Sequence, residues 1–423
     1  MGRAFRNGRL WLALTVLCLC LVLLPGSMLA AGHEDSQESK AAYLSTYFDI
    51  DITKEITRQE FADALLKLQP EDGVGAEALT PANPKYGLGA LDAVKGAVIG
   101  ANLEELALVY TSEKAAASLA AAGVTGVPAS YAPYVACALD VGLIDQSGAK
   151  LAAANQESGS ASVISLLMAV ADINGVSRNY LGYTDEPGIY AEFVNRWEAL
   201  TLFDDEKLSS VGAEMVTQKA TTGFNLKSSA NDARFLPELT LIYGHSDIKH
   251  ARQLLALLNS EGIVARVQFE PKISIYQYLP EWGAPGEPTP TYEVRTIRDD
   301  LMLAYATEYD MVLEFSDPAD MAALDRLVLD YAKKNSGEEG KRLLYSSWWQ
   351  PLYYSYFDMG DGYHKIYDNV LSNGVYSIHP FSLEENRAGV LSVFQNIDPK
   401  LEVTQVPIWC DAPFYRYLYG EPE

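Results

Sequence analysis

The sequence has few cysteines and few basic residues for its length. It holds four cysteines among 423 residues, and two of them, Cys18 and Cys20, lie in an apolar run close to the N-terminus. The other two, Cys137 and Cys410, are far apart, so a disulfide framework is excluded and a single bridge is not expected. The 32 lysines and arginines are outnumbered by 56 acidic residues, which gives a formal net charge of -24. This acidity disfavours a nucleic-acid partner, because phosphate binding needs a basic surface.

The N-terminus has the layout of a secretory signal peptide. Three arginines precede an uninterrupted apolar run over residues 10–24, and the small residues Ala30 and Ala31 follow it. The run is short for a membrane span of about 20 residues. We therefore expect a signal peptide over residues 1–31, export of the chain, and no stable membrane span after cleavage. The cleavage site is imperfect, which leaves an uncleaved N-terminal anchor as the alternative.

The length predicts two or three domains, at about 100 to 200 residues each. An apolar content of 48% and a charged content of 21% are ordinary for a globular protein, so the bulk of the chain should fold. The polar stretch 32–40 is an exception and is predicted to be a disordered tether. Beyond the signal we expect a helical module over residues 32–175, a helical bridging segment over 176–235 and a C-terminal α+β domain over 236–423.

The clearest local signal is a helix start at Thr57. Thr57 and Glu60 have the spacing of a capping box, in which the hydroxyl accepts a backbone N–H and the carboxylate reaches back to the cap. Ile56 before the cap and Phe61 after it form the matching hydrophobic staple. Arg58 then lies in the first turn and is expected to face solvent, beside free N–H groups and the positive end of the helix dipole, where an anion could dock. The alternative is that this stretch is only a well-capped helix.

Two stretches of the N-terminal half resemble the S-layer homology (SLH) family. Residues 56–61 resemble its I-T-R-A-E-F signature, with Gln59 in place of the usual alanine. The pair Tyr131 and Ala132, with the sequence Gly-Leu-Ile at 142–144, resembles the other half of an SLH repeat. Where a further signature should fall, the helical pattern over 160–170 has neither Arg nor Glu at its start.

This resemblance spans about residues 41–175 and implies an anchoring module. In SLH domains the arginine of the signature helps to bind an acidic, pyruvate-bearing polysaccharide of the bacterial cell wall. The resemblance therefore implies that Arg58 contacts the carboxylate of the polymer, while Thr57 and Glu60 hold the helix start. The expected partner is a secondary cell-wall polysaccharide, and the expected location after secretion is the cell wall or cell surface.

The other elements follow from hydrophobic periodicity. One helix is predicted over 91–110 and another over 190–202, whereas 223–232 reads as a connector. The C-terminal pattern is strand, helix, two strands, then again strand and helix, over residues 239–243, 248–261, 263–269, 273–279, 311–315 and 319–333. The fold class is therefore predicted as α+β, with an all-α SLH-like module followed by a ferredoxin-like α/β sandwich.

An aromatic stretch of the C-terminal domain is the second candidate site. Its rings are those of Trp348, Trp349, Tyr353, Tyr354 and Tyr356. Flat rings stack on the faces of sugars, so these residues are a candidate ligand face. The alternative is that the rings fill the core between sheet and helices, as large aromatic side chains usually do.

No motif identifies an enzyme. The sequence has no G-x-S-x-G, no Walker-type loop and no recognisable cysteine nucleophile. His245 and His250 are poorly placed to share a metal ion, and the turn at 358–362 lacks the spacing of a calcium loop. We therefore predict no catalytic residue, no metal and no cofactor. The alternatives to the anchoring role are a secreted enzyme acting on glycan or peptide, with the aromatic residues lining its cleft, and a surface assembly or ligand-binding protein.

Overall fold

The computed structural model describes residues 33, 35–298, 301–331 and 351–421. The signal peptide predicted over 1–31 lies outside these residues. The first part of the described chain is helical, and its buried side chains form one hydrophobic cluster. Its helices are α1 (Gln37–Phe48), α2 (Arg58–Lys67), α3 (Ala76–Leu79), α4 (Ala90–Gly100), α5 (Glu104–Leu108), α6 (Ser112–Ala121), α7 (Ala132–Asp140), α8 (Gln146–Ala154) and α9 (Ser160–Ile173).

Helix α2 begins where the sequence predicts. The Thr57 hydroxyl accepts the Glu60 N–H at 3.2 Å, and the Glu60 carboxylate accepts the Thr57 N–H at 2.7 Å. Ile56 and Phe61 are both buried, as a hydrophobic staple requires. The predicted capping box is therefore confirmed, and it fixes the residue at which α2 begins.

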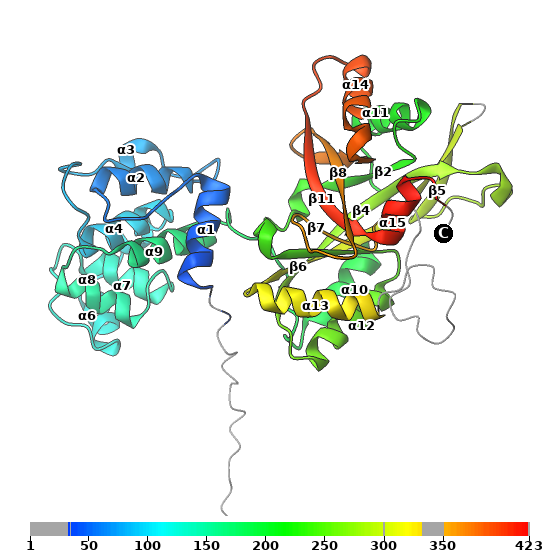
Figure 1. Ribbon diagram of the computed structural model, residues 1–423. Coiled ribbons are helices and arrows are strands. Elements are labelled where there is room, and N and C mark those ends of the chain that lie inside the picture. The colour runs from blue at the N-terminus through cyan, green and yellow to red at the C-terminus, as the bar shows by residue number, and fades with distance from the viewer. Residues whose placement is uncertain (1–32, 34, 299–300, 332–350, 422–423) are drawn as a thin grey trace, which may run out of the picture. The chain divides into compact units, whose positions relative to one another are not determined.

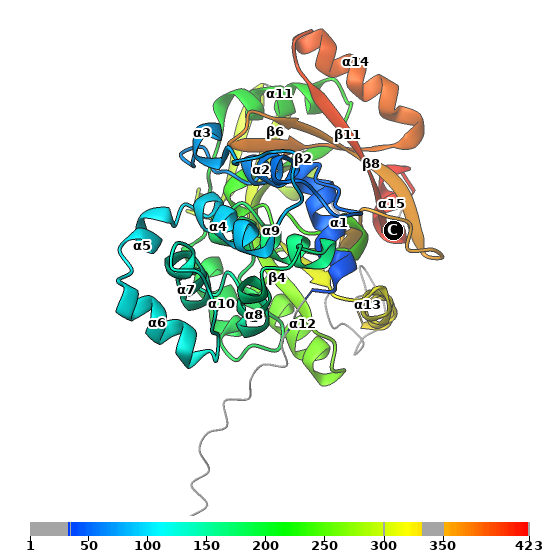
Figure 2. The same ribbon diagram turned by 90° about the vertical axis from the view of Figure 1, so that its left-hand side faces the viewer.

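Helix α4 packs closely against α2 because it carries glycines on the shared face (Figure 2). A Cβ atom on Gly96 would lie 3.1 Å from the Phe61 ring, and one on Gly100 would lie 2.8 Å from Leu65. After Gly100 the chain turns at Asn102, whose φ is positive at 58°, and α5 follows. The prediction of a single helix over 91–110 is therefore wrong. This packing brings Arg58, in the first turn of α2, beside Asp92 in the first turn of α4.

The segment predicted to be a disordered tether is held by ion pairs. Asp35 lies 2.8 Å from Arg266 and 3.2 Å from Arg178, and both arginines pair with Glu314 at 2.7 Å. The Arg178 guanidinium also lies 4.0 Å from the centre of the Tyr43 ring of α1. None of the four charged side chains is more than 11% exposed. The prediction of disorder is therefore wrong for residues 35–40.

The C-terminal part contains a closed antiparallel β-barrel and not the predicted ferredoxin-like sandwich (Figure 1). Eight strands follow one another as β4, β2, β9, β8, β11, β7, β3 and β6, and β6 pairs back onto β4. Three further strands extend it, β1 on β4, β5 on β6 and β10 on β8. The strands are β1 (Gly182–Tyr183), β2 (Gly223–Ser228), β3 (Thr240–His245), β4 (Ala265–Tyr278), β5 (Tyr292–Arg298), β6 (Leu301–Phe315), β7 (Tyr353–Ser355), β8 (Tyr363–Ser372), β9 (Tyr376–His379), β10 (Phe381–Leu383) and β11 (Val403–Asp411).

The sandwich prediction fails because strands were split or missed. The two strands predicted at 263–269 and 273–279 are one strand, β4, which pairs with β6 along its whole length. Strand β2 lies in the predicted connector 223–232, and β8 to β11 were not predicted at all. With these strands in place the sheet has enough partners to close on itself, whereas the predicted sandwich would leave open edges.

Helices pack on the outer face of the barrel (Figure 1). They are α10 (Ile189–Ala199), α11 (Glu206–Thr217), α12 (Ile248–Ser260), α13 (Pro318–Tyr331) and α14 (Arg387–Ile397). Helix α15 (Ala412–Leu418) differs, because its Phe414 shares a buried cluster with Ile242 and Ile366, which alternate with the outward residues of their strands. Short 3₁₀ turns occur at Ser229–Asn231, Pro237–Leu239, Pro280–Trp282 and Glu384–Asn386. Leu254 of α12 packs with Tyr243 of β3, and Phe394 of α14 packs with Ile378 of β9. Because side chains alternate along a strand, the neighbours of these outward residues point into the barrel.

Candidate functional site

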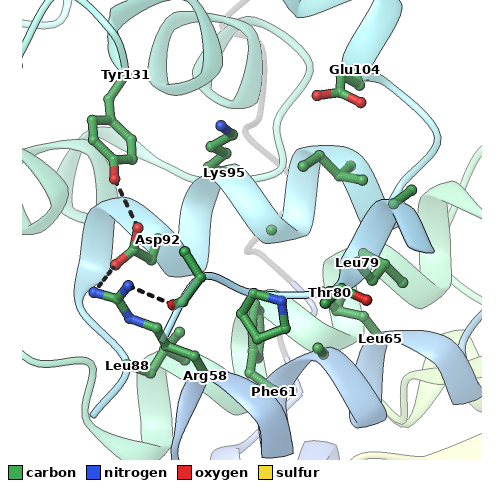
Figure 3. Close-up of a pocket in the computed structure, with 16 residues that line it drawn as sticks. Arg58, Phe61, Leu65, Leu79, Thr80, Leu88, Asp92, Lys95, Glu104 and Tyr131 are labelled. Atoms are coloured by element: carbon green, nitrogen blue, oxygen red, sulfur yellow. Dashed lines mark hydrogen bonds and ion pairs between the residues drawn. The ribbon is translucent and has the colours of Figure 1, made fainter. Parts of the chain in front are cut away.

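Arg58 does not project freely from the start of α2. Its Nη2 lies 2.7 Å from a carboxylate oxygen of Asp92 on α4, and its Nη1 donates to the Ala82 carbonyl at 3.0 Å (Figure 3). The guanidinium lies 5.9 Å from the centre of the Tyr86 ring, and 24% of the side chain is exposed. The expectation of a solvent-facing arginine is therefore wrong, since an internal carboxylate already balances its charge.

Asp92 joins the two stretches that resemble SLH domains. One of its carboxylate oxygens pairs with Arg58, and the other accepts the Tyr131 hydroxyl at 2.8 Å (Figure 3). Tyr131 directly precedes α7, so the first turn of α2 and the aromatic-Ala pair meet at one side chain on α4. The hydrogen bond to Asp92, followed by burial, raises the pKa of Tyr131, which therefore stays a hydrogen-bond donor at neutral pH.

A cavity of about 380 Å³ opens beside these side chains. Its charged lining residues are Arg58 and Lys95, which are cationic, and Asp92 and Glu104, which are anionic. Its other lining residues are Phe61, Ala62, Leu65, Ala78, Leu79, Thr80, Pro81, Ala82, Leu88, Gly96, Ile99 and Tyr131. The wall thus combines apolar side chains with charged and polar groups that could fix the orientation of a polar ligand.

Lys95 is the cation of this cavity that lacks an ion pair within the described part of the chain. Its ammonium lies 4.9 Å from the centre of the Tyr134 ring, and the Tyr134 hydroxyl donates to Glu104 at 3.1 Å. A cation over an aromatic face keeps most of its capacity to donate hydrogen bonds. Lys95 is therefore available to an anionic ligand without the loss of an internal ion pair.

Thr57 and Glu60 stabilise the helix start but are absent from the cavity lining. The backbone hydrogen bond from Thr57 lowers the pKa of Glu60, so the carboxylate stays ionised in the capping box. The later helix α9 begins after Gly159, which provides no side-chain cap. Of the three residues predicted as a site, Thr57 and Glu60 therefore form a structural cap, and Arg58 is part of the cavity wall.

The aromatic stretch is only partly described. Trp348 and Trp349 lie outside the described residues. Tyr353 and Tyr354 are buried in separate hydrophobic clusters, at 6% and 5% exposure, whereas Tyr356 is 36% exposed. Of the described rings in the candidate ligand face, Tyr356 is therefore the one that reaches the surface.

Sequence reasoning missed a group of charged side chains inside the barrel. Asp310 of β6 accepts from Lys272 of β4 at 2.6 Å and from Lys227 of β2 at 2.5 Å. Lys227 also lies 3.5 Å from Glu270, and the Tyr354 hydroxyl donates to Asp310 at 3.4 Å. The sequence signal that could have revealed this buried group is the alternation of its charged residues with apolar ones along the strands. This alternation normally indicates a sheet with one face in water, so it does not by itself predict charged residues inside a barrel.

The electrostatics of this group keep its central pair ionised. Burial lowers the pKa of Lys227, but the negative charge of Asp310 outweighs it and raises the pKa well above its usual range. Burial likewise raises the pKa of Asp310, but Lys227 and Lys272 hold it well below its usual range. Gly244 leaves the room that this arrangement needs, because a Cβ atom there would lie 2.9 Å from Asp310 and 3.1 Å from Lys272.

His245 and His250 lie together but not as metal ligands. Their rings stack with centres 4.1 Å apart, and Nδ1 of His245 accepts the backbone N–H groups of Ser246 and Asp247. Within the described ranges, no three or more His, Cys, Asp or Glu side chains converge as a metal site would require. This pair of rings instead forms part of the packing at the end of β3 and the start of α12.

Two further observations concern the thiols and the membrane. Cys137 and Cys410 are buried, and neither forms a disulfide bond. In the part of the chain that the structure describes, every helix is too short or too polar to cross a membrane.

Comparisons with known proteins returned no relative. No protein-family model, no curated protein and no solved structure matches the chain. The resemblance to SLH domains therefore rests on the residues named above, and function has to be argued from the cavity and the barrel themselves.

Proposed function

We propose that the protein is exported to the bacterial cell surface and associates there with an acidic cell-wall polysaccharide through the cavity beside Arg58. The supporting observation is that the two SLH-like stretches meet at Asp92, on the wall of a cavity of about 380 Å³. Export is supported by the signal-like pattern over residues 1–31. In this proposal the barrel is the part of the protein that is displayed outside the cell.

The roles of the residues differ from those that the resemblance alone implies. Arg58 holds Asp92 and shapes the cavity wall, because both of its Nη atoms already have internal partners. Lys95 makes the contact with the carboxylate of the polymer, since it can form a charge-assisted hydrogen bond without breaking an ion pair. The hydroxyl groups of the sugar would find acceptors in Asp92 and Glu104.

The test is co-sedimentation of the purified protein with cell-wall sacculi. Replacing Lys95 by Ala should weaken binding about tenfold, which corresponds to about 1.4 kcal/mol for one lost charge-assisted hydrogen bond. The affinity of the unchanged protein should fall as salt is raised, and the K95A variant should depend less on salt.

The matched control is Lys150→Ala, which removes an exposed lysine of α8 outside the cavity lining. It should bind as the unchanged protein does. Sacculi stripped of their polysaccharide should bind neither protein. Equal sedimentation of K95A and K150A, with both variants folded by circular dichroism, would remove the cavity from the proposal.

A further inference from the structure

Three side chains inside the barrel form a hydrogen-bonded chain that the cavity at Arg58 does not include. Ser377 Oγ lies 2.8 Å from Nε2 of His379, and Nδ1 of the same ring lies 2.8 Å from Oδ2 of Asp368. This is the order of nucleophile, general base and orienting carboxylate that activates a serine for acyl transfer. The side chains of His379 and Asp368 are 14% and 12% exposed, so they are shielded but still reached by solvent.

The pairing of β8 with β9 and β10 brings the three residues together. Ser377 and His379 are alternate residues of β9 and share one face of the strand. Ile378 between them packs in the hydrophobic cluster beneath α11 and α14, so the shared face is the inner one. Asp368 of β8 is paired with Phe381, two positions beyond His379, which places its carboxylate diagonally across from the imidazole. Paired strands hold such groups more rigidly than a loop would.

A lysine faces the serine from the neighbouring strand. Lys227 of β2 is the direct cross-strand partner of Ser377. Its ammonium is held by Asp310 at 2.5 Å and lies 3.5 Å from Glu270. Directly opposite residues in an antiparallel pair have Cβ atoms about 5 Å apart, so Lys227 and Ser377 leave the sheet at neighbouring positions on the same inner face.

The surroundings of Asp368 favour an orienting role. Its Oδ1 is buried and has no hydrogen-bond partner in the described structure, whereas Oδ2 is committed to His379. Burial, with a smaller contribution from the Asp368 charge, raises the pKa of Tyr354 and of Tyr356, so both rings stay neutral. A neutral tyrosine leaves the carboxylate as the charge nearest the imidazole, which is the arrangement that holds Nδ1 protonated and Nε2 free to accept a proton.

The turn of the hairpin that carries the serine is exposed. Val375, two residues before Ser377, is 60% exposed in the turn between β8 and β9. The backbone N–H of Ser229 donates to the Val375 carbonyl, which fixes this turn against the segment after β2. The ion pair of Lys227 with Asp310 takes up part of the interior next to Ser377, which favours a small acyl group over a large one.

We propose that Ser377, His379 and Asp368 form a second site, independent of the glycan cavity, that hydrolyses esters of small acyl groups. Ser377 Oγ bonds to the carbonyl carbon while its proton passes to Nε2 of His379. The carbon–oxygen bond to the alcohol then breaks, and His379 returns the proton to the leaving oxygen. Water, deprotonated by the same ring, attacks the acyl-serine, so that the carboxylic acid leaves and the serine hydroxyl is restored. Asp368 is a positioning residue that orients the imidazole through its contact with Nδ1.

The test uses the full exported chain and a fluorophosphonate probe, which forms an Oγ–P bond with an activated serine as fluoride leaves. Mass spectrometry should find the adduct on Ser377, and S377A should carry none. Labelling of H379Q should be slower by about 100-fold or more, and D368N should be slowed by a comparable or larger factor. Labelling and p-nitrophenyl acetate hydrolysis by the unchanged protein should share one pH profile, and H379Q should lose it.

The matched control is Ser372→Ala, which removes the serine directly opposite Ser377 in the hairpin. It should leave labelling and ester hydrolysis unchanged. Absence of an adduct on Ser377 in the folded protein, under conditions that label trypsin, would overturn the proposal, as would equal labelling of H379Q and the unchanged chain. The three groups would then be only a structural hydrogen-bonded link. The readout is independent of sacculus binding, so failure of either proposal leaves the other standing.

Discussion

Replacement of Asp310 by Asn should destabilise the barrel strongly. Asp310 is 1% exposed and accepts from two lysines, of which Lys272 is itself only 2% exposed. At 2.6 Å and an effective dielectric constant of about 20, one such pair attracts by about 6 kcal/mol, and desolvation offsets part of this. Removing the carboxylate leaves buried lysine charge without its counter-ion. We therefore expect the free energy of unfolding to fall by about 3 to 5 kcal/mol.

The assay is urea unfolding at pH 7, followed by near-ultraviolet circular dichroism, which reports on the tyrosines packed in the barrel. The matched control is Asp361→Asn, which removes an exposed carboxylate and should change the free energy by less than about 0.5 kcal/mol. Adding Lys272→Met to Asp310→Asn should recover more than half of the loss, because the unpaired charge is removed with it. A loss below about 1 kcal/mol for Asp310→Asn would refute the reasoning.

The pH dependence of the same variant gives a further check on it. The two lysines hold the pKa of Asp310 well below its usual range, although burial acts in the opposite direction. A carboxylate with a lowered pKa contributes stability that is present above its unfolded pKa of about 3.9 and is lost as pH falls through the folded value. The difference between the unchanged protein and Asp310→Asn should therefore be constant from pH 7 to about pH 5 and shrink below about pH 4.

Two other substitutions test the local structure. Thr57→Ala removes the hydroxyl that caps α2 and should lower the free energy of unfolding of the helical part by about 1 kcal/mol, whereas Thr57→Ser should be neutral; equal losses for both would contradict the capping role. Burial lowers the pKa of His250, which faces Asp247, Lys249 and the stacked His245 ring. Its contribution to stability is therefore present above the unfolded pKa of about 6.5 and lost as pH falls. His250→Phe should lose less stability between pH 7 and pH 5 than the unchanged protein does, as measured by urea unfolding, and an equal loss would contradict this.

What could be predicted from the sequence was the structure that nearby residues determine. The start of α2 was found because the cap, the staple and the first turn lie within six positions of one another. Helix α12 was found within one residue of its end, because a single amphipathic stripe and a following glycine define it. Neither prediction needed knowledge of distant parts of the chain.

The barrel could not be predicted in the same way because its closure depends on distant strand pairs. Strand β2 pairs with β9, and the partners Asn225 and His379 are separated by most of the C-terminal part. Strand β4 carries charged residues on its inner face and a proline at its centre, Pro271, which reads as a break between two short strands. The charges are tolerated because Lys272 and its neighbours find partners across the barrel, which no local pattern reveals.

The residues of the candidate sites also divide into those that local sequence predicts and those that depend on distant parts of the chain. The sequence located Arg58 at a helix start, but it gave no indication of Asp92, which approaches from another helix. The sequence likewise has no G-x-S-x-G motif around Ser377, because the geometry of that serine comes from a hairpin and not from a sharp turn before a helix. Chemistry that arises where strands or helices meet leaves little trace in residue spacing.

The position of β11 in the barrel has a consequence for the order in which the molecule is made. This strand, at the far end of the described chain, fits between β8 and β7 and is antiparallel to both. A ribosome adds it after the other strands of the barrel, so the nascent chain carries two unpaired sheet edges, on β8 and β7, until residues 403–411 are present. Exposed sheet edges of this kind pair with strands of other chains. A chain that stops short of β11 should therefore aggregate through its barrel even though its N-terminal helices have already folded.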